Sequence, residues 1–548
     1  MVFNGRNINK YIECLKLIND NIEPMVRTDL PVVDGEWEKN YDKRNQSIQL
    51  NMEGIKEQDL ANEIAELFHG VIRWEHPYAF HNVKTPINIF AAATATMTML
   101  FDPNLAEDKN CGGMANSEFE VVKYMAQAAG WDDNNAGGYF TFGGTSTLMS
   151  AVKIGLCKTK SDSPMLGVDD SMFVICSELE HHSIIKVCNW LGIGKDNCVK
   201  VNTDNNYRLD IHKAEIEIER NLSKGKRLAA IIACGGTTVQ SIIDPINEII
   251  SLRSRIVKKY NLSYVPHLHV DTVITWPLLF FRNYDFDDNI MNFQKDALTV
   301  IREMYNELKC IELVDSFGVD FHKTGFCPFT SSLFMIREKN ELLLMNDGEK
   351  DSLSNVLFGE YTMADYVLES SRSLSGPMSA LSMLKLLGVN GLRTKYYEMT
   401  HWGLYLREKI SEITDFEIVN PPTMGVCVLF YIHNDKFCNK YTEIIKQNMT
   451  KCYRFAKYNY EFYLYSIMKL QEYKILIDYS SGYTHRNEKV FMGVLKLQSF
   501  STSFNKAIID TFIERLVELK TNFDFERACV DFKEVSNARK FRFSFAEK

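Results

Sequence analysis

Short apolar runs alternate with helical patterns through the middle of the chain. Helical patterns cover residues 146–157, 183–191 and 246–260. Alternation of this kind favours a mainly parallel sheet with helices on both faces, so we predict an α/β domain. The runs that we interpret as its buried strands are residues 172–176, 229–234, 267–270, 316–319 and 332–336.

The pattern changes on both sides of this central region. Ile64, Leu67 and Phe68 share one face of a helical pattern, and we interpret residues 1–75 as an N-terminal helical arm that needs a partner surface. Residues 76–373 form the predicted large α/β domain, and residues 374–548 a smaller α+β domain. The predicted elements of the smaller domain are helices at 378–387 and 506–519 and strands at 426–432, 473–478 and 490–497.

Composition and charge narrow the class of protein. The chain has 548 residues, 45% hydrophobic and 24% charged, which is ordinary for a soluble globular protein. A net charge of -9 argues against a broad nucleic-acid surface. We expect no membrane segment, because the longest apolar run, near residues 274–281, is too short to cross a bilayer and the N-terminus lacks a signal-peptide pattern. Thirteen cysteines without a CxxC pair suggest neither a zinc site nor a disulfide framework, so we expect a reducing, cytoplasmic compartment and no metal.

A lysine and an aspartate stand at the ends of two predicted strands. Asp320-Phe321-His322-Lys323 follows one apolar run, and His269-Val270-Asp271 closes another. Because lysine is rarely buried without a role, Lys323 is a good candidate for a buried amine with a chemical function. An amine that can hold an aldehyde, with an acid that can keep a ring nitrogen protonated, is what pyridoxal phosphate needs.

Three further segments carry candidate binding groups, each with a plainer alternative. Gly143-Gly144-Thr145 follows the aromatic run 139–142 and opens a helical pattern; it suits a phosphate, or is a tight turn. In the segment 177–183, a histidine either stacks on a ring or caps the next helix. The segment 234–238, with its paired glycines and threonines, either lies near the same ring or is a structural turn.

In their order along the chain, these segments resemble the group II pyridoxal-phosphate-dependent amino-acid decarboxylases, the family of the glutamate, aromatic amino acid and tyrosine decarboxylases. The resemblance covers about residues 70–400, including Glu75-His76-Pro77 and the segment 367–376 around Arg372. The family usually has two alanines after the aspartate, where this chain has Thr272 and Val273.

The resemblance assigns roles to individual residues. It implies that Lys323 is the Schiff-base lysine, that Asp271 pairs with the pyridine nitrogen, and that His181 stacks on the ring. Thr238 is then a candidate near the ring, and His322 contacts the phosphate or the substrate carboxylate. The phosphate is expected at Gly144 and Thr145. The resemblance further implies the type I fold of pyridoxal-phosphate enzymes, with a mainly parallel seven-stranded sheet, and a homodimer with active sites at the interface.

The implied reaction is decarboxylation of an L-amino acid to its amine, with pyridoxal 5'-phosphate as cofactor. The proton returned to Cα is expected from a tyrosine on a mobile loop, which here is the segment 346–361, and Tyr361 is the candidate, with His322 and Lys323 as substitutes. A second variant of the family has a tyrosine where this chain has Phe329. Two alternatives stay open: an oxidative aldehyde synthase with the same cofactor, and a non-catalytic homologue.

Overall fold

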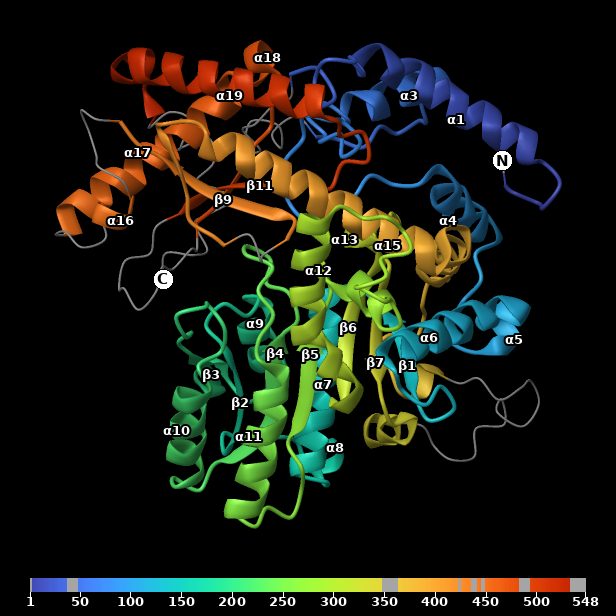
Figure 1. The fold of residues 1–548 in the computed structure, drawn as a ribbon. Helices are drawn as coiled ribbons and strands as arrows, with labels where there is room; N and C mark the ends of the chain where they lie inside the picture. Colours follow the sequence, from blue (N-terminus) through green and yellow to red (C-terminus); the bar gives the residue numbers. More distant parts are fainter. Residues whose placement is uncertain are drawn as a thin grey trace.

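A seven-stranded sheet forms the centre of the molecule (Figure 1). The computed structural model describes residues 2–36, 48–346, 363–421, 425–434, 441–444, 449–481 and 493–532. The strand order is β1-β7-β6-β5-β4-β2-β3, and β7 is antiparallel to both of its neighbours, while the other pairs are parallel. The predicted mainly parallel seven-stranded sheet is confirmed. The strands are β1 (Gly137–Thr141), β2 (Met172–Ser177), β3 (Cys198–Val201), β4 (Arg227–Cys234), β5 (His267–Asp271), β6 (Ser316–Asp320) and β7 (Ser332–Ile336).

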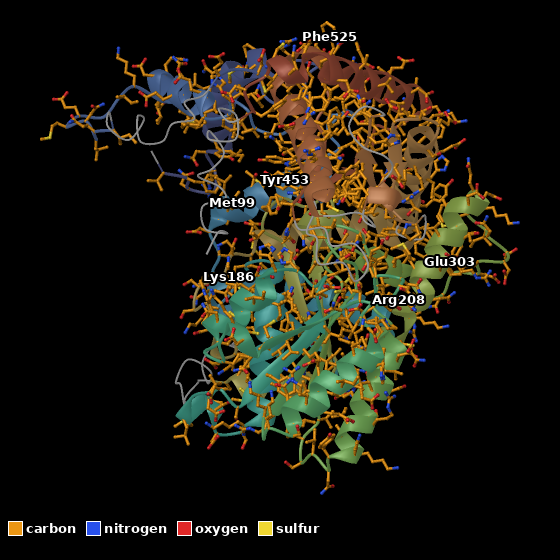
Figure 2. All side chains as sticks on the ribbon, turned by 90° about the vertical axis from the view of Figure 1, so that its left-hand side faces the viewer. Met99, Lys186, Arg208, Glu303, Tyr453 and Phe525 are labelled. Carbon is orange, nitrogen blue, oxygen red and sulfur yellow. The ribbon has the colours of Figure 1, made fainter. Side chains whose placement is uncertain are left out.

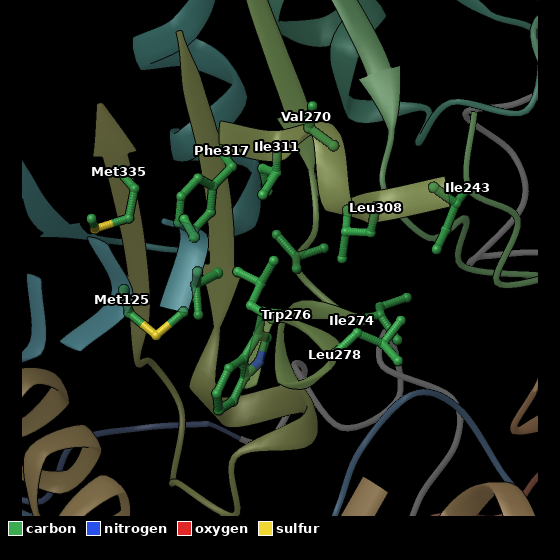
Figure 3. Close-up of a cluster of buried hydrophobic side chains, with 14 of the residues drawn as sticks. Met125, Ile243, Val270, Ile274, Trp276, Leu278, Leu308, Ile311, Phe317 and Met335 are labelled. Atoms are coloured by element: carbon green, nitrogen blue, oxygen red, sulfur yellow. The ribbon is translucent and has the colours of Figure 1, made fainter. Parts of the chain in front are cut away.

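Helices cover both faces of this sheet, which is why its strands are almost continuously apolar. In β4, Ile231 and Ala233 join the core cluster on one face, and Ala230 and Ile232 join the cluster on the other. Figure 3 shows part of the first cluster, which contains Phe317 and Val270 of the sheet together with Trp276. The covering helices are α6 (Asn116–Ala129), α7 (Gly144–Thr159), α9 (Ser183–Trp190), α10 (Ile211–Leu222), α11 (Ile246–Lys259) and α12 (Lys295–Leu308).

A second, antiparallel sheet lies in the C-terminal part, in the order β10-β11-β9-β8. The long helix α15 (Ser375–Ser411) leads to it and is kinked at Gly388, whose φ is 58°. The apolar core of this C-terminal part contains Leu406 of α15, Phe462 of α17 and Leu516 of α19. The elements are β8 (Phe416–Ile418), β9 (Cys427–Ile432), β10 (Asp478–Ser480), β11 (Val494–Gln498), α17 (Met449–Met468) and α19 (Lys506–Glu526).

The N-terminal helix α1 (Ile8–Ile22) extends along the upper edge of the molecule (Figure 1). It packs on α3 (Glu57–Glu66), yet no residue of α1, all of which the structure describes, is buried. No helix in the described ranges is both long and apolar enough to cross a membrane. The remaining short helices are α5 (Asp108–Cys111), α8 (Ser163–Leu166), α13 (Phe321–Thr324), α16 (Tyr441–Ile444), α18 (Leu470–Tyr473), η1 (Glu23–Met25), η2 (Gly112–Ala115), η3 (Lys195–Asn197), η4 (Trp276–Phe281), η5 (Lys309–Leu313), η6 (Lys339–Met345), η7 (Met363–Asp365) and η9 (Arg527–Cys529); α4 spans Ile89–Phe101.

The predicted elements differ from the structure mainly outside the central sheet. The edge strand β3 was missed because it has only four residues, of which the two middle ones are only partly buried. The strand predicted at 473–478 is wrong, since α18 ends at Tyr473 and β10 begins only at Asp478. Helix α17 was also missed, because tyrosine and phenylalanine are weak helix formers and are frequent there. The predicted strand at 490–497 begins outside the described residues, as does most of the predicted loop 346–361.

Candidate active site

Five loops meet at the carboxyl edge of the central sheet. Strands β1, β2, β4, β5 and β6 run in the same direction, so the residues that follow them gather at one edge, where ligands bind in open α/β sheets. A cavity of about 220 Å³ lies there. Seven residues singled out in the sequence line it, while Tyr361 lies outside the described residues. They are Gly144, Thr145, His181, Thr238, Asp271, His322 and Lys323.

Lys323 reaches the cavity from α13, directly after β6. Its Nζ lies 3.0 Å from Oδ2 of Asp320, and 22% of its side chain is exposed, so the amine is partly rather than fully buried. Asp320 is itself fixed by the hydroxyl of Ser332, which donates to Oδ1 at 2.5 Å. A Cβ on Gly144 would come within 2.8 Å of Oδ2 of Asp320, so the first turn of α7 lies directly against this carboxylate.

The backbone around Lys323 is held by a segment that sequence reasoning missed. The buried Lys84 donates from Nζ to the carbonyl oxygens of His322 and Cys327, at 2.7 and 2.8 Å. The backbone N–H of Thr85 donates to the carbonyl of Lys323 at 2.8 Å. Burial lowers the pKa of Lys84 to about 8. These bonds fix the path of the chain on both sides of the candidate lysine.

Asp271 ends β5 and is buried at the wall of the cavity. Its Oδ1 accepts the N–H of Val273 at 3.3 Å. Burial raises the pKa of Asp271, while the positive charge of Lys323 and a hydrogen bond from the Glu180 side chain act in the opposite direction. Asp271 therefore has a neighbouring cation and hydrogen-bond donors that favour its ionised form against the effect of burial.

Glu180 also lines the cavity, and sequence reasoning passed over it. It is buried, its Oε1 accepts the N–H of His181 at 2.9 Å, and the thiol of Cys234 donates to Oε2 at 3.1 Å. Burial raises the pKa of Glu180 well above its usual range, and the charge of Asp271 raises it further. The sequence feature that could have identified Glu180 is its position shortly after a buried strand, in the segment 177–183 that contains the candidate histidine.

Burial favours the neutral form of the two histidines in the cavity. Burial, and then the charge of His182, lowers the pKa of His181 to about 3, and its Nδ1 lies 2.7 Å from the hydroxyl of Ser183. Burial also lowers the pKa of His322. Its Nδ1 lies 3.1 Å from the carbonyl oxygen of Ser331 and accepts the N–H of the same residue at 3.3 Å, and its Nε2 lies 3.6 Å from Oδ2 of Asp320, so each ring nitrogen has a partner for the proton.

The turn after β4 is shaped by Gly236. Its φ is 143°, and a Cβ there would lie 2.3 Å from Cγ2 of Thr275. The buried carboxylate of Asp244 accepts the N–H of Cys234 at 2.8 Å, so it fixes the end of the strand before this turn. The carbonyl of Thr238 accepts a hydrogen bond from Gln498 of β11 at 3.3 Å, which links the turn to the small sheet.

These residues fit a phosphorylated pyridine aldehyde. The first N–H groups of α7 have no acceptor within their helix and present the positive end of its dipole, beside Gly144 and Thr145. The same cavity is lined by an amine at Lys323, a buried carboxylate at Asp271 and the neutral ring of His181. Within the described ranges, no cluster of His, Cys, Asp and Glu side chains is arranged to hold a metal ion.

Comparison with known proteins gives matches in both sequence and structure. Residues 297–432 match the pyridoxal-dependent decarboxylase conserved domain. The chain is 25% identical over 265 residues to an aspartate 1-decarboxylase from Aliivibrio fischeri, a match that covers 48% of this chain and 42% of that enzyme. It is 22% identical over 371 residues to an acidic amino acid decarboxylase from Xenopus tropicalis, covering 66% of each. In sequence, therefore, the chain spans less than two thirds of the lengths of these two relatives.

In structure the similarity extends over nearly the whole chain. Mouse CSAD in its apo form matches with a TM-score of 0.77, covering 93% of this chain and 98% of that one. Since the sequence identity is 19%, this similarity concerns the fold.

Proposed function

We propose that the chain is a member of the group II pyridoxal-phosphate-dependent amino-acid decarboxylases, with the type I fold of pyridoxal-phosphate enzymes and pyridoxal 5'-phosphate as cofactor, and, from this premise, that it converts an L-amino acid to its amine and CO2. The observation that carries the proposal is the convergence on one cavity of Lys323, Asp271 and the N-terminus of α7. These three supply an amine for the aldehyde, a carboxylate for the ring nitrogen and a site for the phosphate.

Each residue has a stated task in this proposal. When bound, the cofactor supplies an electron-withdrawing ring that stabilises the negative charge left at Cα by the departing carboxylate. Asp271 keeps the ring nitrogen protonated, because an ionised carboxylate favours a neighbouring cation. His181 packs against the ring as a neutral imidazole, since its pKa is about 3. Thr238 borders the ring, and Gly144 and Thr145 bind the phosphate through their backbone N–H groups.

Proton return to Cα is assigned to groups near the amine. Nε2 of His322, which lies 3.6 Å from Oδ2 of Asp320, can donate a hydrogen bond to the substrate carboxylate when it carries the ring proton; Nδ1 then accepts the N–H of Ser331 at 3.3 Å. Lys323 lies beside it, paired with Asp320. Tyr361 remains the candidate on the loop that lies outside the described residues.

A second candidate function keeps the cofactor and changes the product. The ring of Phe329 lies 4.5 Å from that of His322, so this position next to the amine offers no hydroxyl group as a proton donor. Without a donor, the charge at Cα can react with oxygen, and an aldehyde with ammonia and peroxide replaces the amine. Measuring amine against aldehyde, ammonia and oxygen uptake for each standard amino acid separates the two functions and identifies the substrate.

The assignment of Lys323 is tested by chemical trapping. Borohydride reduction followed by peptide mapping should place the pyridoxyl group on Lys323, and Lys323→Ala should lose both the label and turnover. Lys186→Ala is the matched control, because this lysine is exposed on α9 and does not line the cavity (Figure 2). A pyridoxyl group on another lysine, or an absence of label in wild type, contradicts the assignment; the second result favours the non-catalytic homologue.

The proposal includes a homodimer with the active sites at its interface. Support comes from α4, which exposes apolar side chains next to the segment that holds Lys323: Ile89 is 86% exposed and Met99 58% (Figure 2). Exposed apolar surface of this kind is typical of an interaction site. The unburied α1 is the second element expected to pack on a partner. A monomer with full activity in sedimentation at assay concentration contradicts this part.

Compartment and domain limits complete the proposal. A cytoplasmic location is supported by the described cysteines, all of which are free thiols. We keep the division into an arm at 1–75, a large domain at 76–373 and a small domain at 374–548. Helix α15, which begins at Ser375, supports the second boundary.

A further inference from the structure

Two buried carboxyl groups lie side by side where one is sufficient to pair with a ring nitrogen. Glu180 and Asp271 both line the cavity, and their side chains are close enough for a hydrogen bond between them. They come from different strands, since Glu180 follows β2 and Asp271 ends β5. Burial raises the pKa of both carboxyl groups, and the charge of Asp271 raises that of Glu180 further, so the buried pair holds a proton.

The surroundings decide which carboxyl group carries that proton. Burial raises the pKa of Asp271 and the charge of Asp320 adds to this, but the charge of Lys323 and the hydrogen bond with Glu180 act in the opposite direction and favour ionised Asp271. The pKa of Glu180 is raised first by burial and then by the charge of Asp271. Glu180 is therefore the proton donor of the pair and Asp271 the acceptor. The remaining contacts of Glu180, with the N–H of His181 and the thiol of Cys234, hold the side chain in this position.

We propose that Glu180 is a positioning residue for the cofactor: it remains protonated and donates a hydrogen bond to Asp271, which keeps that carboxylate charged and directed at the ring nitrogen. This inference rests on the function proposed above, because it acts through the ring nitrogen of pyridoxal phosphate. Lys323 cannot do this alone, since its amine is consumed in holding the aldehyde. A neutral donor such as Glu180 supports Asp271 whether or not that amine is free.

The second link in the argument is the contact between Glu180 and His181. The Oε1 of Glu180 accepts the backbone N–H of the residue whose ring is assigned to the cofactor face. One side chain thus touches both groups that are expected to contact the ring. Removing it is expected to affect the binding of a ring that has a nitrogen more than the binding of a ring without one.

The experiment compares two cofactors and three variants. Cofactor-free protein is titrated with pyridoxal 5'-phosphate, and with an analogue whose ring nitrogen is replaced by carbon. Glu180→Gln keeps a donor that cannot ionise, and Glu180→Leu removes the donor at similar volume. Glu178→Gln is the matched control, because this acid of the same segment lies away from the cavity and accepts the N–H of Thr203 at 3.0 Å. Circular dichroism verifies that each variant is folded.

The expected result is selective. Glu180→Gln and Glu178→Gln bind both compounds as wild type does. Glu180→Leu binds pyridoxal phosphate about tenfold to a hundredfold more weakly, the loss typical of a hydrogen bond to a charged group, and binds the analogue unchanged. An infrared difference spectrum of cofactor-free wild type minus Glu180→Gln shows the carbonyl band of a protonated carboxyl group.

Several results overturn the inference. They are unchanged binding of pyridoxal phosphate by Glu180→Leu, an equal loss in Glu180→Gln, an equal loss for both compounds, and no carboxyl band in the difference spectrum. The spectrum still decides if Glu180→Leu does not fold. If wild type binds no pyridoxal phosphate, the proposed function itself is wrong and this inference falls with it; the other results arise in protein that binds the cofactor, so the two failures are distinguishable.

Discussion

Replacing Arg372 by methionine tests the buried ion pair between Arg372, which lies just before α15, and Glu118 of α6. Arg372 meets Glu118 of α6 through two bonds, Nη1 to Oε1 at 3.0 Å and Nη2 to Oε2 at 3.1 Å. It also donates to the carbonyl groups of Phe140 and Leu105. The side chains are only 4% and 1% exposed, so Arg372→Met leaves a carboxylate buried without its cation.

The magnitude follows from this burial. Removing one partner of a buried pair costs about 3–5 kcal/mol, because the remaining charge has lost its solvation and its counter-charge. Phe140 belongs to β1, which leads to the turn at Gly144, and its N–H donates to Oε1 of Glu118 at 2.7 Å. The affinity for pyridoxal phosphate is therefore expected to fall together with stability.

The assay is urea unfolding followed by circular dichroism, with the free energy of unfolding as the readout. The double variant Arg372→Met with Glu118→Met should recover much of the loss, since neither charge is then buried alone. The matched control is Arg302→Met: its pair with Asp287 is 2.8 Å long but 49% and 82% exposed, so the expected change is within about 1 kcal/mol. A loss from Arg372→Met no larger than this control would refute the reasoning.

Three further predictions concern buried groups and a strained turn. The first concerns Lys84, whose pKa is lowered to about 8 by burial. Between pH 8 and 10.5 the unfolded chain keeps the proton that folded Lys84 has lost, so wild type should gain up to about 3 kcal/mol of unfolding free energy relative to Lys84→Met across this range. Equal pH profiles of the two proteins in urea unfolding contradict this. The second concerns His267, whose pKa is lowered to about 3 by burial, so that below pH 6.5 the unfolded state binds a proton that the folded state does not. Near pH 5, the free energy of unfolding of wild type should therefore fall by about 1.3 kcal/mol for each unit that the pH is lowered, relative to His267→Gln, as measured by thermal unfolding. Gly236→Ala should cost about 1–3 kcal/mol and weaken cofactor binding, because its φ of 143° and the contact with Thr275 exclude a Cβ; wild-type stability and affinity in a titration would show that the turn can adapt.

The sequence was sufficient to predict most strands of the central sheet and seven of the residues that line the cavity. Five predicted strands lie within β2, β4, β5, β6 and β7, because strands buried on both faces are read directly as apolar runs. Polar residues at the carboxyl ends of such strands must gather at one edge when the strands are parallel. That rule, with the resemblance to a known family, is why seven residues far apart in the chain were assigned to one site.

Tertiary structure alone decided which groups support that site. Lys84 contacts the carbonyl groups of His322 and Cys327, and Glu180 contacts Asp271. Because these partners are distant in sequence, no local sequence pattern predicts the contacts. The charge states also depend on the fold, since burial raises the pKa of Glu180 and lowers that of His181 to about 3. The buried strands can be predicted from the apolar runs in the sequence, because each run is local. A protonation state depends on every element that packs around the titratable group, so it requires the tertiary structure.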